Sequence, residues 1–163
     1  MTTLLVVGGA DDSVVITGLA DLGATYELRL LQPTGPHDLP AGGVDGHLVL
    51  ADSIPDEVAR EIAGWPAGRV HGLVLLAGSG TPTLPPYLPA LAGWGVPTLV
   101  VAPADGERRA AGQLLSAGVP DAVFVVTEEG PAEPQATTVH WVASFLSIVD
   151  GLRDARSPEV IEQ

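Results

Sequence analysis

The chain of 163 residues contains no cysteine, no lysine and no asparagine. Without cysteine there can be no disulfide, no thiolate catalysis and no zinc or iron–sulfur site built on cysteine. Without lysine there can be no Schiff base and no P-loop lysine. Lysine and asparagine have AT-rich codons, so their joint absence indicates a bacterium with a high-GC genome.

Positive charge is also scarce. All 7 basic residues are arginines, and the formal net charge is −13. A phosphate polyanion or an anionic membrane would be repelled, so neither nucleic acid nor a membrane is expected as a partner. The simplest interpretation of the acidic residues is a solvated surface that keeps the protein soluble.

Long apolar runs are missing, although 46% of the residues are hydrophobic. No run approaches the length of about 20 residues that spans a bilayer. The first residues lead directly into an apolar strand without a basic segment, so no secretory signal is visible and a cytoplasmic location is expected.

Short apolar segments alternate with helical patterns along the whole chain. We predict strands at 4–7, 28–31, 47–50, 73–76, 98–101 and 123–126, and helices at about 13–22, 53–65, 84–91, 107–116 and 136–152. Ser53 is expected to cap the second helix, and Gly23 to end the first. The pattern predicts an α/β three-layer sandwich with a mainly parallel sheet of about six strands, flavodoxin-like or caspase-like. Residues 1–156 form one domain, and 157–163 resemble the start of a truncated helix or a tail.

Small and acidic residues follow the predicted strands. In open α/β sheets, ligands bind at the carboxyl ends of the strands. The ligand-binding candidates at these ends are Asp11, Asp12, Ser13, Asp52, Ser53, Ser79, Thr81 and Asp105. Four of these are aspartates that could converge on Mg²⁺, but each also has a sufficient role as a helix cap or a loop solubiliser. We therefore expect no metal, no cofactor and no assigned catalytic residue.

Two glycine-containing turns resemble known motifs only in part. The turn at 78–81, Gly-Ser-Gly-Thr, lacks the Gly-Lys of a P-loop, and Ala77 and Thr81 stand where a nucleophile elbow has glycine. The turn could contact an anion through backbone amides or serve only as a connection. Gly8-Gly9 lacks the third glycine of a dinucleotide fingerprint. His47 and His71 precede strands, at the edge away from the expected site, and only His37 could approach Ser79.

The last predicted helix is apolar on two faces. One face is expected to pack on the sheet. The second, the interface candidates Trp141, Phe145, Ile148 and Leu152, is expected to meet another copy of the chain or another protein. A single wide core contact is the alternative explanation.

Residues 45–118 resemble the caspase-like CHAT protease domains of bacterial effector proteins. The matching stretches are 46–52, 72–79 and 95–101. The family's catalytic Cys position falls on Gly78, and its His position falls near Ala51 or Asp52, so the resemblance implies a pseudo-protease.

The stretches 96–101 and 115–125 are similar to the fourth and fifth strands of response-regulator receiver domains. The phospho-acceptor position falls at Ala77 or Gly78, and the expected lysine is absent. Such a receiver would signal by binding or dimerising.

Both resemblances favour a non-catalytic signalling module that acts by protein association, as a homodimer or with a partner protein. The alternative is a small-molecule-binding domain or hydrolase with its site at the carboxyl ends of the strands.

Overall fold

Six parallel strands form a single sheet in the computed structural model, which describes residues 2–8, 18–52, 54–77, 84–104, 106–127 and 136–155. The strand order is β2-β1-β3-β4-β5-β6. The strands are β1 (Thr3–Val7), β2 (Glu27–Leu31), β3 (Gly46–Ala51), β4 (Val70–Leu76), β5 (Thr98–Pro103) and β6 (Val123–Thr127). The first five follow the flavodoxin-type order, and β6 extends it.

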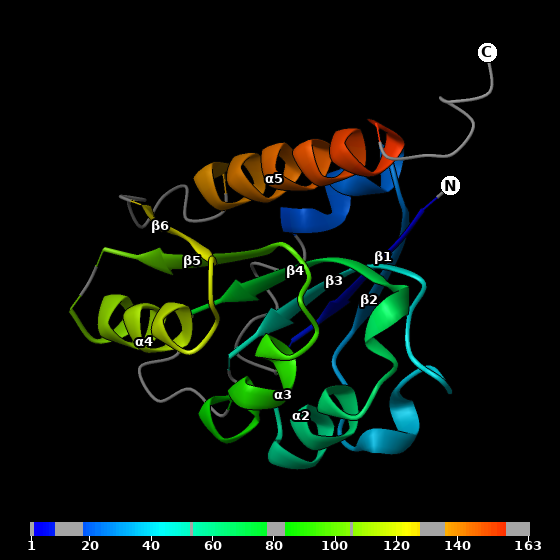
Figure 1. The fold of residues 1–163 in the computed structure, drawn as a ribbon, viewed down its shortest axis with the longest axis horizontal. Helices are drawn as coiled ribbons and strands as arrows, with labels where there is room; N and C mark the ends of the chain where they lie inside the picture. Colours follow the sequence, from blue (N-terminus) through cyan, green and yellow to red (C-terminus); the bar gives the residue numbers. More distant parts are fainter. Residues whose placement is uncertain are drawn as a thin grey trace.

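Helices cover both faces of the sheet, as Figure 1 shows. On one face lie α2 (Asp56–Ala63), α3 (Leu88–Ala92) and α4 (Gly106–Ala117). On the other lie α5 (Ala136–Ala155) and the short 3₁₀ helix η2 (Leu19–Ala24). Three further 3₁₀ turns connect the layers: η3 (Pro36–Asp38), η4 (Ala67–Arg69) and η5 (Pro85–Tyr87). The predicted three-layer α/β sandwich is confirmed.

The core consists of two apolar layers, because successive strand residues point to opposite faces. Leu48, Leu50 and Leu73 pack with α2, α3 and α4 on one face. Val49 and Val74 pack with α5 and η2 on the other. The central strands are buried on both faces and are therefore apolar over most of their length, with His47 and His71 near their amino ends as exceptions.

Two predictions concern the ends of the helices. Pro55 occupies the N-cap position of α2. The capping role predicted for Ser53 falls on a residue outside the described ones and stays a prediction. Gly23 does not end the first helix, since η2 continues through it to Ala24. Residues 13–17 of the helix predicted at 13–22 lie outside the described residues.

Prolines delay the helix before β5. The segment forms the turn η5 and then α3, which begins at Leu88 with Pro89 in its first turn, where a missing N–H costs nothing. In the part of the chain that the structure describes, no helix has the length and apolar character needed to cross a bilayer.

Candidate functional site at the carboxyl edge of the sheet

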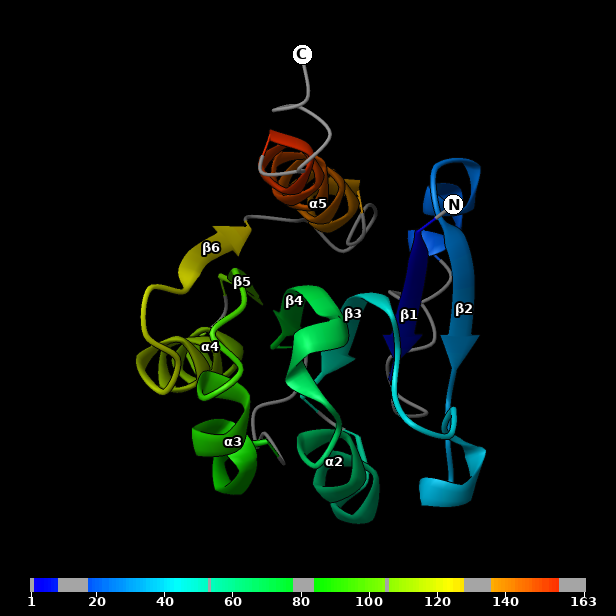
Figure 2. The same cartoon turned by 45° about the vertical axis from the view of Figure 1, so that its right-hand side comes forward.

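The parallel topology places the carboxyl ends of β1, β3, β4 and β5, which the candidate residues follow, at the same edge of the sheet. β1 lies between β2 and β3, and the chain crosses from β2 over β1 to reach β3. Strand order therefore reverses between β1 and β3, and such a switch point is where open α/β sheets bind ligands. Figure 2, which looks along the sheet from the side, shows β1 and β3 as neighbours at this point.

The register defines which residues leave the sheet side by side. Val7 pairs with Leu50, so the chain leaves β1 at Gly8 next to the end of β3. The amide of Asp52 donates to the carbonyl oxygen of Leu76 at 2.9 Å, which holds the end of β3 against the end of β4. The amide of Ala77 donates to the carbonyl oxygen of Val101 at 2.8 Å and ties β4 to β5 in the same way.

Asp52 is the only ligand-binding candidate that lies within the described residues. Its side chain is completely buried at the end of β3. The other candidates, Asp11, Asp12, Ser13, Ser53, Ser79, Thr81 and Asp105, lie outside the described residues. Each follows within a few residues of a described strand end, so the sequence positions are compatible with convergence on this edge. The prediction of ligand-binding roles stays a prediction.

The strand-to-helix connections differ in length and in chemistry. Between β3 and α2 the connection is Asp52-Ser53-Ile54-Pro55. Between β5 and α4 it is Ala104-Asp105, which has no hydroxyl group. The connection from β4 to η5 carries Ser79 but is twice as long as the one after β3. Ser53 is thus the serine in a short strand–turn–helix connection at the switch point.

A polar loop lies beyond the carboxyl end of β2. The backbone N–H and the hydroxyl of Thr34 donate to Oδ2 of Asp38 at 2.9 and 3.1 Å. The hydrogen bond from the Thr34 backbone is the main cause that lowers the pKa of Asp38. Nε2 of His37 lies 3.4 Å from Oδ1 of Asp38, and the histidine side chain is largely exposed. This His–Asp pair therefore stands in solvent, and the predicted approach of His37 to Ser79 lies outside the described residues.

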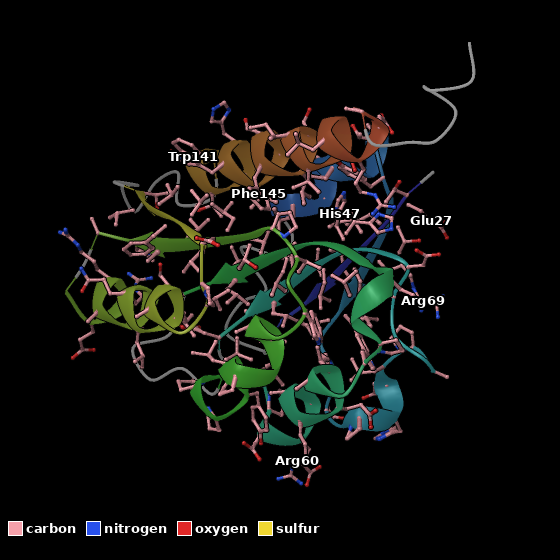
Figure 3. All side chains as sticks on the ribbon, in the orientation of Figure 1. Glu27, His47, Arg60, Arg69, Trp141 and Phe145 are labelled. Atoms are coloured by element: carbon pink, nitrogen blue, oxygen red, sulfur yellow. The ribbon has the colours of Figure 1, made fainter. Side chains whose placement is uncertain are left out.

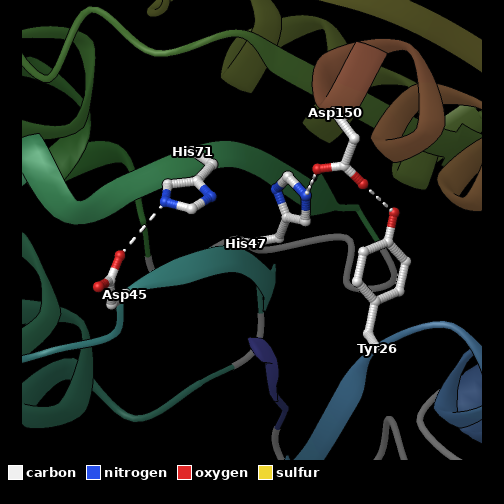
Figure 4. Close-up of polar contacts among 5 residues, drawn as sticks. All are labelled: Tyr26, Asp45, His47, His71 and Asp150. Carbon is white, nitrogen blue, oxygen red and sulfur yellow. Dashed lines mark hydrogen bonds and ion pairs between the residues drawn. The ribbon is translucent and has the colours of Figure 1, made fainter. Parts of the chain in front are cut away.

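The most extensive polar cluster of the described residues lies at the opposite, amino edge of the sheet (Figure 4). Asp150 on α5 accepts a hydrogen bond from the Tyr26 hydroxyl at 2.7 Å, and its other oxygen lies 2.8 Å from Nε2 of His47. The ring of His71 lies edge-on to that of His47, with 5.7 Å between centroids, and its Nε2 lies 3.3 Å from Oδ1 of Asp45. The prediction that His47 and His71 lie away from the carboxyl edge is confirmed.

The burial of His47 determines its protonation. A carboxylate can only accept, so Nε2 of His47 carries the proton in the bond to Asp150. Its Nδ1 is buried without a hydrogen-bond partner among the described groups and faces Gly72, where a Cβ would lie 3.1 Å away. Burial lowers the pKa of His47 below its usual value of 6.5, in spite of the hydrogen bond to Asp150. The residue is therefore neutral near pH 7 and fixes α5 to the sheet.

Tyr26 completes the fixation of α5. Burial, followed by the bond to Asp150, raises the pKa of its hydroxyl, so it remains a donor at all physiological pH values. No motif in the sequence marks Asp150 as a partner of Tyr26 and His47. The one available signal was that Asp150 is the first charged residue after the uncharged stretch 136–149 of the last helix.

The predicted contact stripe on α5 is exposed in part. Val142, Leu146 and Val149 are buried against the sheet, as predicted. The exposed fractions of Trp141, Ile148 and Leu152 are 40%, 63% and 50%, and Phe145 is half-buried. The alternative of a single wide core contact is therefore wrong for these described residues. Figure 3 shows Trp141 and Phe145 on α5, and His47 below the later turns of the same helix.

Comparison with known proteins identifies fold relatives. No protein-family model and no curated protein matches the chain. The structure is similar to the enol-lactonase of Burkholderia xenovorans LB400, with a TM-score of 0.61, 11% identity, and coverage of 90% of this chain and 91% of that one. It is also similar to a thermophilic esterase of Thermogutta terrifontis, with a TM-score of 0.58, 14% identity, and coverage of 91% and 90%.

A third similar structure is an α/β hydrolase from Sphaerobacter thermophilus, with a TM-score of 0.51, 14% identity, and coverage of 86% of this chain and 92% of that one. None of the three is a CHAT protease or a receiver domain. The prediction of a non-catalytic signalling module, pseudo-protease-like or receiver-like, is contradicted by these neighbours, all of which are hydrolases. That prediction rested on the short apolar sequences of parallel strands, and many unrelated α/β folds share such sequences.

Proposed function

We propose that the protein is a hydrolase that acts on a carboxylic ester or lactone at the carboxyl edge of its sheet. The neighbours in fold are a lactonase, an esterase and an α/β hydrolase, and each covers nearly the whole chain. The cytoplasmic location expected from the N-terminal sequence belongs to the same proposal.

The observation that carries the proposal is the position of Ser53. It follows β3 at the switch point and stands in the short connection to α2. Hydrolases of this fold class place the nucleophilic serine on such a strand-to-helix turn. Ala51 and Pro55 stand where the usual motif has glycine, so the chain departs from the motif at both positions, and the proposal rests on the place of Ser53 in the topology. Ser53 is therefore the proposed nucleophile.

Backbone N–H groups near Ser53 would stabilise the negative charge that develops in the transition state. In this arrangement the N–H of the residue after the nucleophile, here Ile54, donates to the developing oxyanion, and a second N–H comes from the loop after an adjacent strand. The loop that begins at Gly8 has that position, since β1 is the neighbour of β3. The first turn of α2 is close in sequence, and the positive end of a helix dipole favours an anion.

The histidines restrict the choice of general base. His47 and His71 lie at the amino edge and are committed to Asp150 and Asp45. His37 and His140 are the two remaining histidines of the chain. His37 has a carboxylate partner and follows β2 on the carboxyl side, so it is the first base to test by substitution.

The test is covalent labelling of the purified protein with a fluorophosphonate, followed by peptide mass spectrometry. We expect the label on Ser53 and hydrolysis of p-nitrophenyl acetate above the buffer rate. Ser53→Ala should remove the label and reduce kcat/KM by a factor of at least about 10³, because the nucleophile acts in the transition state.

Ser79→Ala is the matched control, since it removes the serine that follows β4. It should retain both label and activity. A label on Ser79 would move the nucleophile to the end of β4. A protein that neither takes up the label nor hydrolyses ester or lactone substrates would refute the proposal.

A further inference from the structure

Among the described residues, one face of the molecule combines the uncharged outer strand β6 with the apolar stripe of α5. β2 and β6 are the two outer strands of the sheet. β2 carries the exposed charges of Glu27 and Arg29, which is a common protection against pairing with another strand. β6 has the sequence Val-Phe-Val-Val-Thr, without a charge, and its Val123 is 50% exposed.

The stripe and β6 are continuous. Val123 and Val125 share the face of β6 that α5 covers, since Val125 packs in the same apolar cluster as Val142 and Phe145. On α5, the side chain of Asp150 points toward Tyr26 and His47, that is, to the side of the helix away from β6. The helical spacing places Phe145, Ile148 and Leu152 on the opposite flank, which is the flank toward β6. Figure 1 shows β6 below the amino-terminal end of α5.

Charge argues for the identity of the occupant. Two copies with a net charge of −13 repel each other over most of their surface. Residues 136–149 of α5 and all of β6 contain no Asp, Glu, Lys or Arg, so within the described residues these two segments can face a second copy without bringing like charges into contact.

We infer that the β6–α5 face, formed by Val123, Val125, Trp141, Phe145, Ile148 and Leu152, binds the same face of a second copy of this chain. A two-fold axis brings the two β6 strands together antiparallel, so that the sheets join, and packs the two α5 helices over the junction. The inference does not depend on the proposed hydrolase activity.

The expected affinity is modest. The 20 residues of α5 extend about 30 Å, and a helix with its side chains is about 10–12 Å wide, so α5 and the five residues of β6 offer less than the roughly 800 Å² per copy of a standard interface. We therefore expect weak association, with a dissociation constant of the order of micromolar or above.

The experiment is light scattering coupled to size exclusion, or analytical ultracentrifugation, on the full chain from about 1 to about 200 μM. The wild type should approach twice its mass of 16.6 kDa. Ile148→Glu and Val123→Glu should each raise the dissociation constant by at least tenfold, because each places a charge opposite its own copy. Circular dichroism and urea melts confirm that each variant folds.

Leu114→Glu is the matched control, because Leu114 is 52% exposed on α4, which covers the other face of the sheet. It should dimerise like the wild type. A wild type that stays monomeric over the whole range would overturn the inference. So would equal disruption by Leu114→Glu, and a dimer that Val123→Glu leaves intact would overturn the pairing of β6.

Discussion

The fold keeps His47 neutral, so the contribution of this residue to the free energy of unfolding depends on pH. It is fully buried, it donates to Asp150, and its second nitrogen has no described partner. The ionisable groups that act on it are Asp150 and Arg153 from α5 and His71 from β4. Protonation would put a second N–H against Gly72, where nothing accepts it.

The stability of the protein should therefore fall as the pH drops below about 6.5. Burial lowers the pKa of His47 in the folded state, so the unfolded chain binds the proton first. Well above pH 6.5 neither state is protonated, and the contribution is complete. Below it, the free energy of unfolding decreases by up to about 1.4 kcal/mol per pH unit for this one group.

Urea unfolding between about pH 5 and pH 7 measures this slope. His47→Gln keeps an N–H for Asp150 and has no titrating ring, so its slope should be smaller. His140→Gln, which changes an exposed histidine on α5, serves as the control. Equal slopes in His47→Gln and the wild type would show that other groups cause the pH dependence.

At the scale of elements, the pairing of β1 with β3 depends on Gly46. This residue has a φ of +155° and pairs with Thr3 in the register of the two strands. A Cβ at this position would collide with the backbone carbonyl oxygen of Thr3. Since backbone cannot rotate away as a side chain can, only glycine lets β3 enter the sheet beside β1.

Gly46→Ala should reduce the free energy of unfolding by at least about 2 kcal/mol. Gly151→Ala on α5 is the comparison, because no atom lies within 4 Å of the added Cβ. It should stabilise the protein by about 0.5–1 kcal/mol, since alanine favours the helix. Urea melts measure both, and a neutral Gly46→Ala would show that β1 and β3 can separate without cost.

At the scale of the whole molecule, the charge of −13 decides how copies meet. The six side chains of the proposed dimer face are uncharged, whereas repulsion acts between the surrounding surfaces. Salt shortens the range of that repulsion and leaves apolar contacts intact.

Self-association should therefore become several-fold stronger when the ionic strength rises from about 20 mM to about 200 mM. Sedimentation at both salt concentrations measures the change, with Ile148→Glu as the variant that should remain monomeric at either. A dimer weakened by salt would indicate an interface of opposite charges.

Several features of this protein could be predicted from the sequence alone. The apolar runs at 73–76 and 98–101 predict central strands, because a strand buried on both faces needs apolar residues at every position. The small and acidic residues after the strands predict which edge carries the candidate site. The spacing in the last helix predicts both its buried face and its exposed stripe.

Contacts between distant parts of the chain and the order of the strands are not contained in local sequence patterns, and only the tertiary structure decided them. The bond between His47 and Asp150 joins residues 103 positions apart, and no periodicity encodes such a pair. The reversal of strand order next to β3 is also a property of the topology. It changes Ser53 from a predicted helix cap into the proposed nucleophile. Strand and helix patterns are local consequences of side-chain burial, whereas the order of strands in a sheet depends on long-range packing, which only the folded chain reveals.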